Sequence, residues 1–365
     1  MRIKEVIKNI PLLSRVNGEI KKHKYIHLMY NDKFTKPYID FLKSNFNTDE
    51  HLFLWKRWIK DSKVAPFPEG DNVIEIFSLA GLNLSAENIE KIYCHTLFDK
   101  EIINYLYSHD KQLKEKAYWI IWGGDLYNAP DNEKNNYVRK HIRGYISSAK
   151  GDETFAKEKY GSNPELYNAP YWGDPMTPFI VKSSQNPEKP DCIRIQINNS
   201  CDKTTLEMLD ILSKFKDENI RIVTPLSYGR MEYKEEIIKK GRGIFGDKFE
   251  YINDFMAPEE YLKNLSQNHI FILFQNRQQG GGNAAAALYY GAKVYVRKEV
   301  ITYKNLMFHG AVPYDANLIK DMSFREFAEY REEDKIKSQK SMTEFYSAKI
   351  AIKSWTEVFA GRPNI

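Results

Sequence analysis

The sequence predicts an α/β protein of two Rossmann-like domains, each a wound parallel sheet covered by helices, that face each other across a cleft. Three observations lead to this prediction. The chain has 365 residues, about twice the usual size of a single domain. Short β-type runs alternate with helical stretches, the pattern that produces parallel sheets. The alternation stops at a polar segment with two prolines, residues 182–190, which is expected to be an interdomain linker, and then restarts.

The first half is expected to form the first of these sheets. Runs rich in aromatic and β-branched residues predict strands, and longer runs with apolar residues three or four apart predict helices. Strands are expected at 25–30, 51–55, 73–77, 91–96, 118–122 and 144–148, with helices such as 37–45, 100–107 and 133–143 between them.

The second half repeats the pattern. Strands are expected at 192–197, 220–225, 249–252, 270–274 and 293–296, and helices at 203–215, 233–241, 258–264 and 283–290. An amphipathic stretch at 341–359 is expected to pack as a closing helix. The predicted organisation is therefore a first domain at 1–182, a second domain at 191–340 and a closing segment at 341–365.

Composition excludes several classes of protein. Hydrophobic residues at 42% and charged residues at 28% are those of a globular protein. The longest uncharged stretch, residues 278–292, is short of the ~20 apolar residues that span a bilayer. Cys94, Cys192 and Cys201 are odd in number and lack metal-ligand spacing, which argues against a disulfide framework or a zinc site. These features, with no secretory signal in the first residues, predict a cytoplasmic protein.

The net charge of +5 is concentrated at the amino terminus. Residues 1–24 hold seven Lys and Arg against two Glu, and the other 341 residues balance at 47 against 47. A broad nucleic-acid surface is therefore not expected. The basic arm either contacts an anionic membrane surface or forms a solvated helix that packs on the body through its apolar residues.

The most informative motif runs from Phe274 to Asn283, after a predicted strand and directly before a helix. Its glycines, Gly280, Gly281 and Gly282, let backbone N–H groups approach an anion, and the helix N-terminus adds partial positive charge. Arg277, Gln278 and Gln279 supply side chains for phosphate and sugar hydroxyls. The motif matches neither a P-loop nor the dinucleotide fingerprint. It indicates a phosphate site, with a flexible left-handed turn as the alternative.

A second motif ends a buried strand of the first half. The residues are Trp122, Gly123, Gly124, Asp125, Leu126 and Tyr127. Ligands bind outside the carboxyl ends of parallel strands, so Asp125 is a candidate general base. It equally suits a helix cap or a loop support. His95, at the end of the preceding strand, is the alternative base, although a lone histidine is more often structural.

Three further segments lie at strand ends or helix starts. Their candidate residues are Asn199, Ser200 and Asp202, then Tyr228 and Gly229, and lastly Asp152. The first group either caps a helix or binds phosphate, and the Tyr-Gly pair suits a stacked base or sugar. Asp152 either lines the cleft or begins the next helix.

Taken together, these motifs resemble the family of the bacterial TDP-N-acetylfucosamine:lipid II N-acetylfucosaminyltransferase, the 4-alpha-L-fucosyltransferase-like glycosyltransferase family 56. The matching residues are His95, Trp122 to Tyr127, Gly151-Asp152 with Phe155-Ala156, Asn199-Ser200 with Asp202, Tyr228-Gly229, and Arg277 to Gly282. They occur in order over most of residues 24–360.

The resemblance implies a GT-B glycosyltransferase. Its second domain would hold a nucleotide-diphosphate sugar such as TDP-Fuc4NAc, and its first would present a polyprenyl-diphosphate-linked saccharide at the inner face of the cytoplasmic membrane, for enterobacterial common antigen or O-antigen type polysaccharide. Asn283 stands where the family is expected to have threonine, and residues 31–90 look unrelated. The chain holds no Asp-x-Asp pair, so we expect no metal cofactor.

Two other functions fit the same patterns. A nucleotide-sugar 2-epimerase would share the fold but release no lipid-linked product. A scaffold that binds sugar nucleotide or lipid would retain binding without turnover. Both remain open at the level of sequence.

Overall fold

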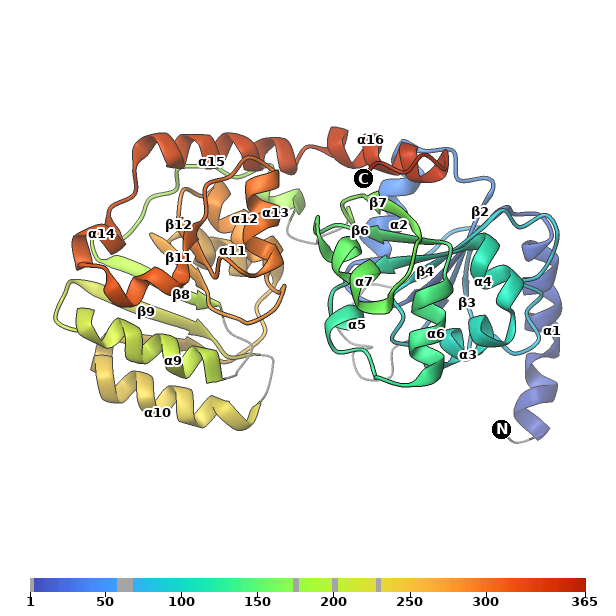
Figure 1. Cartoon of the computed structure of the whole chain (residues 1–365), viewed down its shortest axis with the longest axis horizontal. Coiled ribbons are helices and arrows are strands. Elements are labelled where there is room, and N and C mark those ends of the chain that lie inside the picture. The colour runs from blue at the N-terminus through green and yellow to red at the C-terminus, as the bar shows by residue number, and fades with distance from the viewer. Residues whose placement is uncertain (1–2, 58–67, 173–176, 199–202, 228–230) are drawn as a thin grey trace. The chain divides into compact units, whose positions relative to one another are not determined.

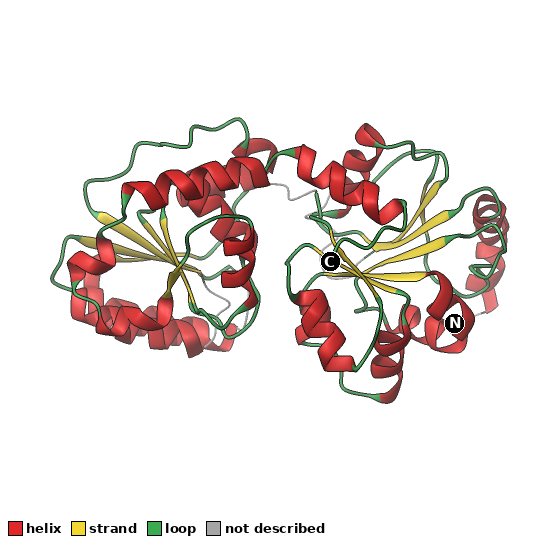
Figure 2. Cartoon of the chain, turned by 45° about the horizontal axis from the view of Figure 1, so that its top comes forward, coloured by secondary structure: helices red, strands yellow, loops and turns green. Residues whose placement is uncertain are grey.

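The computed structural model describes the chain except residues 1–2, 58–67, 173–176, 199–202 and 228–230. The chain divides into two compact units. Unit 1 comprises Met1–Pro175 together with Ala348–Ile365, and unit 2 comprises Met176–Ser347 (Figure 1). In each unit helices cover both faces of a parallel sheet (Figure 2).

Unit 1 is built on a seven-stranded parallel sheet with the order β3-β2-β1-β4-β5-β6-β7. Its strands are β1 (Tyr25–Tyr30), β2 (His51–Lys56), β3 (Val73–Glu75), β4 (Lys91–His95), β5 (Ala117–Ile121), β6 (Gly144–Ser147) and β7 (Glu165–Asn168). Its helices are α1 (Ile3–Ile20), α2 (Thr35–Asn45), α3 (Lys100–Ser108), α4 (Asp110–Lys116), α5 (Gly124–Tyr127), α6 (Glu133–His141), α7 (Asp152–Tyr160) and α16 (Ala348–Phe359).

Alternate side chains of each strand of unit 1 enter different cores. In β1, Ile26 and Leu28 join one apolar cluster, whereas Met29 joins another on the opposite face. Successive side chains of a strand point to opposite faces of a sheet. A sheet covered on both faces therefore requires the nearly continuous apolar runs that the sequence shows, such as β5 with all five residues buried.

Unit 2 has a six-stranded parallel sheet with the order β10-β9-β8-β11-β12-β13. Its strands are β8 (Ile193–Asn198), β9 (Ile220–Pro225), β10 (Phe249–Ile252), β11 (Ile270–Leu273), β12 (Lys293–Val296) and β13 (Tyr314–Asp315). Its helices are α8 (Thr177–Ile180), α9 (Lys203–Leu212), α10 (Lys234–Phe245), α11 (Pro258–Ser266), α12 (Gly281–Tyr289), α13 (Ile301–Phe308), α14 (Phe324–Ala328) and α15 (Glu332–Phe345).

The predicted strands are present in the expected order, with most ends within two residues. The sequence did not predict the last strand of either sheet. β7 carries a polar Asn and Glu, and β13 has only two residues, so neither shows a pattern that stands out from a loop.

The closing segment at 341–359 differs from its prediction. Two helices meet there, α15 and α16, and α16 belongs to unit 1. Trp355 decides this placement, because its side chain is fully buried in the unit 1 core and its Nε1 donates a hydrogen bond to Pro170 O at 2.9 Å. Truncating such a buried aromatic side chain costs about 3–5 kcal/mol.

The segment predicted as a linker, residues 182–190, also lies within unit 2 rather than between the units. Ser183 Oγ lies 2.8 Å from Tyr290 Oη, and Lys189 Nζ donates to Asn268 O at 2.7 Å. Its prolines and polar residues therefore mark a surface strap rather than the domain boundary, which falls before α8.

Candidate active site

In each unit the strand order reverses beside the first strand, which places a topological switch point at the carboxyl ends of β8 and β11 in unit 2. Ligands of wound sheets bind at such points. The glycine-rich turn follows β11, and Gly280 has φ +68°, in the left-handed region. A Cβ at Gly280 would lie 2.6 Å from Asn198 Nδ2. Glycine is therefore required here for close approach of β8 and the turn.

A buried polar cluster lies beside this turn. Asn198 Oδ1 accepts a hydrogen bond from Asn283 Nδ2 at 3.1 Å, and Gln275 Nε2 donates to the backbone oxygen of Asn198. Within the described part of the chain, Asn198 Nδ2 and Gln275 Oε1 are buried and have no hydrogen-bond partner. Buried polar atoms are rarely left unpaired, so this cluster has the features of a site that a polar ligand completes.

The sequence missed Asn198 and Gln275, although each ends or directly follows a strand of the second sheet. The predicted residues of the turn, Arg277, Gln278, Gln279, Gly281 and Gly282, are partly buried beside them. Arg277 Nη1 donates to Gln278 O at 3.2 Å. The predicted residues Asn199, Ser200, Asp202, Tyr228 and Gly229 lie outside the described residues.

The sequence also missed a second arginine, Arg297, which follows β12. Its guanidinium carbon lies 3.7 Å from the centroid of the Phe274 ring, and Nη2 donates to Glu207 at 3.2 Å. Among the described residues its buried Nε has no partner. Stacking on an aromatic ring fixes the plane of a guanidinium, so Arg297 is an ordered cation at the same edge of the sheet.

In unit 1, Asp125 is fully buried and is held by three N–H donors. Oδ2 accepts hydrogen bonds from Leu97 N at 2.9 Å and Trp119 Nε1 at 2.6 Å, and Oδ1 accepts one from Trp122 N at 2.9 Å. These donors belong to β5 and to the loops that follow β4 and β5. The role of Asp125 as a base stays a prediction, but these contacts favour the alternative reading, a loop support.

Arg139, which the sequence analysis did not single out, completes the same support. Its side chain is fully buried, and Nη2 donates to Leu97 O at 2.9 Å and to Asp125 O at 3.2 Å. Asp125 and Arg139 thus bind the N–H and the C=O of Leu97. Together they fix the loop after β4 against the loop after β5.

His95 ends β4 as predicted, but the structure does not bring it together with Asp125. His95 Nε2 lies 3.0 Å from His27 Nδ1, and His95 Nδ1 lies 2.9 Å from Tyr171 Oη. His95 is fully buried on the face of α2, whereas Asp125 reaches Trp119 on the opposite face. Burial lowers the pKa of His95 to about 3, so its imidazole is neutral.

Asp152 begins α7, and Tyr127 Oη donates a hydrogen bond to its Oδ1 at 2.6 Å. Burial raises the pKa of Asp152 to about 7, against the lowering effect of this hydrogen bond. A carboxyl group that titrates near neutral pH is suited to general acid–base chemistry. The Tyr127 ring, partly exposed, stacks on Phe155 at a centroid distance of 5.3 Å.

The carboxyl edge of the unit 1 sheet also holds unsatisfied polar atoms. Asn31 follows β1, Thr96 follows β4 and Trp122 follows β5, three neighbouring strands. Asn31 Oδ1, Thr96 Oγ1 and Trp122 Nε1 are buried without a partner among the described residues. Thr96 has φ +79°, which is strained for a β-branched residue and is typical of functional sites. This edge is therefore a second candidate binding site.

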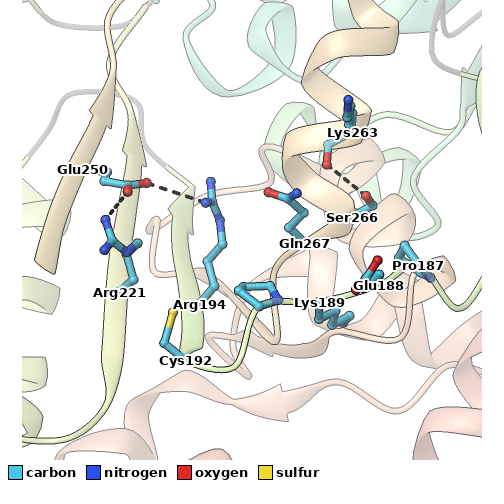
Figure 3. Close-up of a pocket in the computed structure, with 11 residues that line it drawn as sticks. Pro187, Glu188, Lys189, Cys192, Arg194, Arg221, Glu250, Lys263, Ser266 and Gln267 are labelled. Carbon is cyan, nitrogen blue, oxygen red and sulfur yellow. Dashed lines mark hydrogen bonds and ion pairs between the residues drawn. The ribbon is translucent and has the colours of Figure 1, made fainter.

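A hollow of about 580 Å³ lies at the opposite, amino edge of the unit 2 sheet (Figure 3). Arg194 near the start of β8 and Arg221 near the start of β9 line it. Glu250 pairs with both, at 3.6 Å from Arg194 and by a hydrogen bond to Arg221. This hollow lies at the opposite ends of the strands from the glycine-rich turn, so it is not the place where the sequence predicts the donor site.

Of the described helices, none is long and apolar enough to cross a membrane. No cluster of three or more His, Cys, Asp or Glu side chains arranged to hold a metal ion occurs in the described residues.

Two wound parallel sheets, with a glycine-rich helix N-terminus at the switch point of the second, are the architecture found in the class of GT-B glycosyltransferases. The comparisons agree with this class and specify the family. The family model of 4-alpha-L-fucosyltransferase, glycosyl transferase group 56, matches residues 82–360. The chain therefore belongs to glycosyltransferase group 56, and it is a glycosyltransferase.

Solved structures show the same fold at low sequence identity. The α,α-trehalose-6-phosphate synthase of Burkholderia multivorans is 9% identical with a TM-score of 0.63, covering 93% of this chain and 96% of that one. The lipopolysaccharide outer core galactosyltransferase WaaB is 10% identical with a TM-score of 0.62, covering 92% and 99%. A putative UDP-N-acetylglucosamine 2-epimerase from Listeria monocytogenes is 11% identical with a TM-score of 0.54, covering 94% and 98%.

Proposed function

We propose that this glycosyltransferase moves a deoxy-amino sugar from a nucleotide-diphosphate donor such as TDP-Fuc4NAc to a polyprenyl-diphosphate-linked saccharide, in the synthesis of a bacterial surface polysaccharide of the enterobacterial common antigen or O-antigen type. The observation that carries the proposal is the unsatisfied Asn198 and Gln275 pair beside the glycine-rich N-terminus of α12. Structural neighbours crystallised with UDP or UDP-2-fluoro glucose, and the family itself, support a nucleotide-sugar donor.

The donor diphosphate would bind at the N-terminus of α12. The backbone N–H groups of Gly281 and Gly282 and the helix dipole stabilise the negative charge that grows on the leaving diphosphate. Arg277 and Arg297 add cationic side chains at this edge. Because these groups supply the positive charge and the chain has no Asp-x-Asp pair, we propose transfer without a bound metal.

The acid–base role falls best on Tyr127 and Asp152. As the acceptor oxygen forms its bond to the anomeric carbon, the bond from that carbon to the diphosphate breaks. The acceptor proton passes to Tyr127 Oη, whose own proton passes to Asp152 Oδ1 along the 2.6 Å hydrogen bond. Asp125 and His95, the candidates from the sequence, would support the loops around this pair.

The acceptor would bind at the carboxyl edge of unit 1, where Asn31, Thr96 and Trp122 present unsatisfied polar atoms. Contact with the inner face of the cytoplasmic membrane is proposed for the basic amino-terminal arm. Val16 and Ile20 of α1 are buried in the unit 1 core. A test by deletion must therefore stop at residue 11, which removes Arg2, Lys4 and Lys8 of the seven basic residues. Reduced sedimentation with anionic vesicles is the expected result.

The decisive experiment supplies purified protein with TDP- and UDP-linked sugars and a lipid-linked saccharide, and follows products by mass spectrometry. A lipid-linked product one sugar longer is expected. Conversion of the donor to its 2-epimer without an acceptor would replace the proposal with epimerisation. Donor binding without any product would favour a scaffold, and absence of donor binding would contradict the site in unit 2.

A further inference from the structure

Three histidines of unit 1 form a continuous chain of hydrogen bonds inside the protein. His27 lies on β1, His51 on β2 and His95 on β4. His27 Nε2 lies 2.9 Å from His51 Nδ1, and His27 Nδ1 lies 3.0 Å from His95 Nε2. The chain ends at Tyr171, whose Oη lies 2.9 Å from His95 Nδ1. The three imidazoles are at most 3% exposed.

The hydrogen-bonded chain runs across three neighbouring strands, from the amino end of one to the carboxyl end of another. His51 is the first residue of β2, His27 is in the middle of β1, and His95 is the last residue of β4, and these strands are neighbours in the sheet. Tyr171 lies at the carboxyl edge, with its ring 5.5 Å from the ring of Trp122. The chain therefore connects the candidate acceptor edge with the amino edge of the sheet.

Packing keeps the imidazoles in place. The His27 ring stacks on Phe53 at 4.5 Å and on Tyr93 at 4.9 Å, and the Tyr171 ring stacks on Tyr38 at 4.5 Å. Burial lowers the pKa of His27 well below its ordinary value, and the neighbouring His51 and His95 lower it further. Burial lowers the pKa of His51 to about 4, although Glu50 acts to raise it. All three rings are therefore neutral at physiological pH, and each neutral imidazole has one donor and one acceptor nitrogen.

This connectivity couples the three tautomers. If Tyr171 donates to His95 Nδ1, then His95, His27 and His51 must all carry their proton on Nε2. If the direction is reversed, all three carry it on Nδ1 and His95 donates to Tyr171 Oη. If neighbouring imidazoles had different tautomers, two donors or two acceptors would face each other at one link. The free-energy cost would be about that of one lost buried hydrogen bond.

We propose that His51, His27, His95 and Tyr171 form one proton relay with a shared imidazole tautomer, and that the relay positions the Tyr171 hydroxyl to contact a polar group of the acceptor. One proton shift at each link reverses the whole chain: Tyr171 passes a proton to His95, His95 passes one to His27, and His27 passes one to His51. The Tyr171 oxygen takes a proton from the polar group of the acceptor, and His51 Nε2 gives one to water at the amino ends of the strands, so that no net charge remains on the chain. Tyr171 thus binds the acceptor, and the three histidines are positioning residues that act through it. Only the contact with the acceptor rests on the function proposed above.

The tautomers can be measured without any substrate, by ¹⁵N–¹H correlation spectra of the ¹⁵N-histidine-labelled protein at neutral pH. The expected result is the same protonated nitrogen in His27, His51 and His95. Different tautomers in neighbouring rings, or an imidazolium among the three, would overturn the relay. Assignment uses single substitutions of each histidine by phenylalanine.

Substituting Tyr171→Phe tests the coupling. The hydroxyl is lost at one end, and the expected result is a changed nitrogen shift or tautomer ratio at His51, two imidazoles away. Tyr167→Phe is the matched control, since the Tyr167 hydroxyl donates to Glu165 and not to the chain. An unchanged His51 signal in Tyr171→Phe would overturn the coupling.

The contact with the acceptor is tested by kinetics. Tyr171→Phe should raise the KM for the lipid-linked acceptor about fivefold to tenfold, the value of one neutral hydrogen bond, and leave donor affinity unchanged. Unchanged kinetics would overturn this contact. Absence of transfer in the wild-type protein would count against the proposed function, whereas the histidine spectra decide the relay independently.

Discussion

The substitution Asp125→Asn separates the two roles that this residue has been assigned. A general base would lose turnover but little stability, because asparagine has nearly the same shape. A loop support would lose stability, because the carboxylate accepts three hydrogen bonds from Leu97 N, Trp119 Nε1 and Trp122 N. The structure therefore predicts destabilisation as the first effect.

The size of the effect follows from the geometry. An asparagine has one carbonyl oxygen, which can take the Oδ2 position and keep the bonds from Leu97 and Trp119. Its amide group then faces the N–H of Trp122, donor against donor. The loss of one hydrogen bond to a charged acceptor costs about 1.5–3 kcal/mol, and the two remaining bonds weaken as the charge is lost. We expect the variant to be destabilised by about 2–4 kcal/mol, or about 4–16 °C in the Tm of unit 1.

The assay is urea unfolding followed by circular dichroism, with donor affinity measured by calorimetry on the folded variant. Asp131→Asn is the control, because Asp131 is exposed and accepts from Asn136; it should change stability by less than about 0.5 kcal/mol. If Asp125→Asn folds with wild-type stability and turnover falls at least ~100-fold, the loop-support reasoning is refuted and Asp125 is the base.

Four other predictions follow from the same structure. The pKa of Asp152 is about 7, so turnover should fall as the pH drops below about 7, where the carboxylate takes up a proton. Asp152→Asn should lower turnover at least ~100-fold, and a wild-type pH–rate profile in this variant would exclude Asp152 as the base. Gly281→Ala should lower the affinity for TDP and UDP at least about tenfold in calorimetry, because a side chain would stand at the proposed phosphate site. The variant should stay folded, because the added Cβ would come no closer than 3.9 Å to Gln278 Nε2. Gly280→Ala, at positive φ, should also destabilise the fold, and unchanged affinity in both variants would contradict the phosphate site. Turnover should survive EDTA, and complete loss that magnesium or manganese restores would show a metal requirement. The pKa values of His27, His51 and His95 are lowered in the folded protein, so the unfolded state takes up protons below about pH 6.5 that the folded state does not, and stability is full above that pH and falls towards pH 4. His27→Phe should reduce the slope of stability against pH by about 1.4 kcal/mol per pH unit relative to the wild-type protein, and an unchanged slope would mean that His27 also takes up a proton in the folded state.

The sequence by itself determined the architecture and the position of the glycine-rich turn. Strand and helix periodicities are local properties, so the two wound sheets could be predicted from runs such as β1, β9 and β12, each placed to the residue. The glycine-rich turn was also legible, because a strand, three glycines and a helix are consecutive in the chain. For the same reason His95 was correctly placed at a strand end. Asp125 lies four residues beyond β5, in α5, and Asp152, for which the sequence left a cleft position and a helix start open, begins α7.

The tertiary structure decided what those side chains do. Asp125 and His95 occupy similar positions in the sequence, but three N–H donors surround the first and two hydrogen-bonding rings surround the second, on opposite faces of one sheet. Asn198 is the last residue of β8, and Gln275 lies two residues after the end of β11. The two residues are 77 positions apart in the sequence, and only the pairing of β8 with β11 makes them neighbours. Burial and hydrogen-bond partners come from residues far apart in the chain, whereas periodicity comes from residues close together. The burial and the hydrogen-bond partners of these side chains could therefore be known only from the tertiary structure, whereas the periodicity could be read from the sequence.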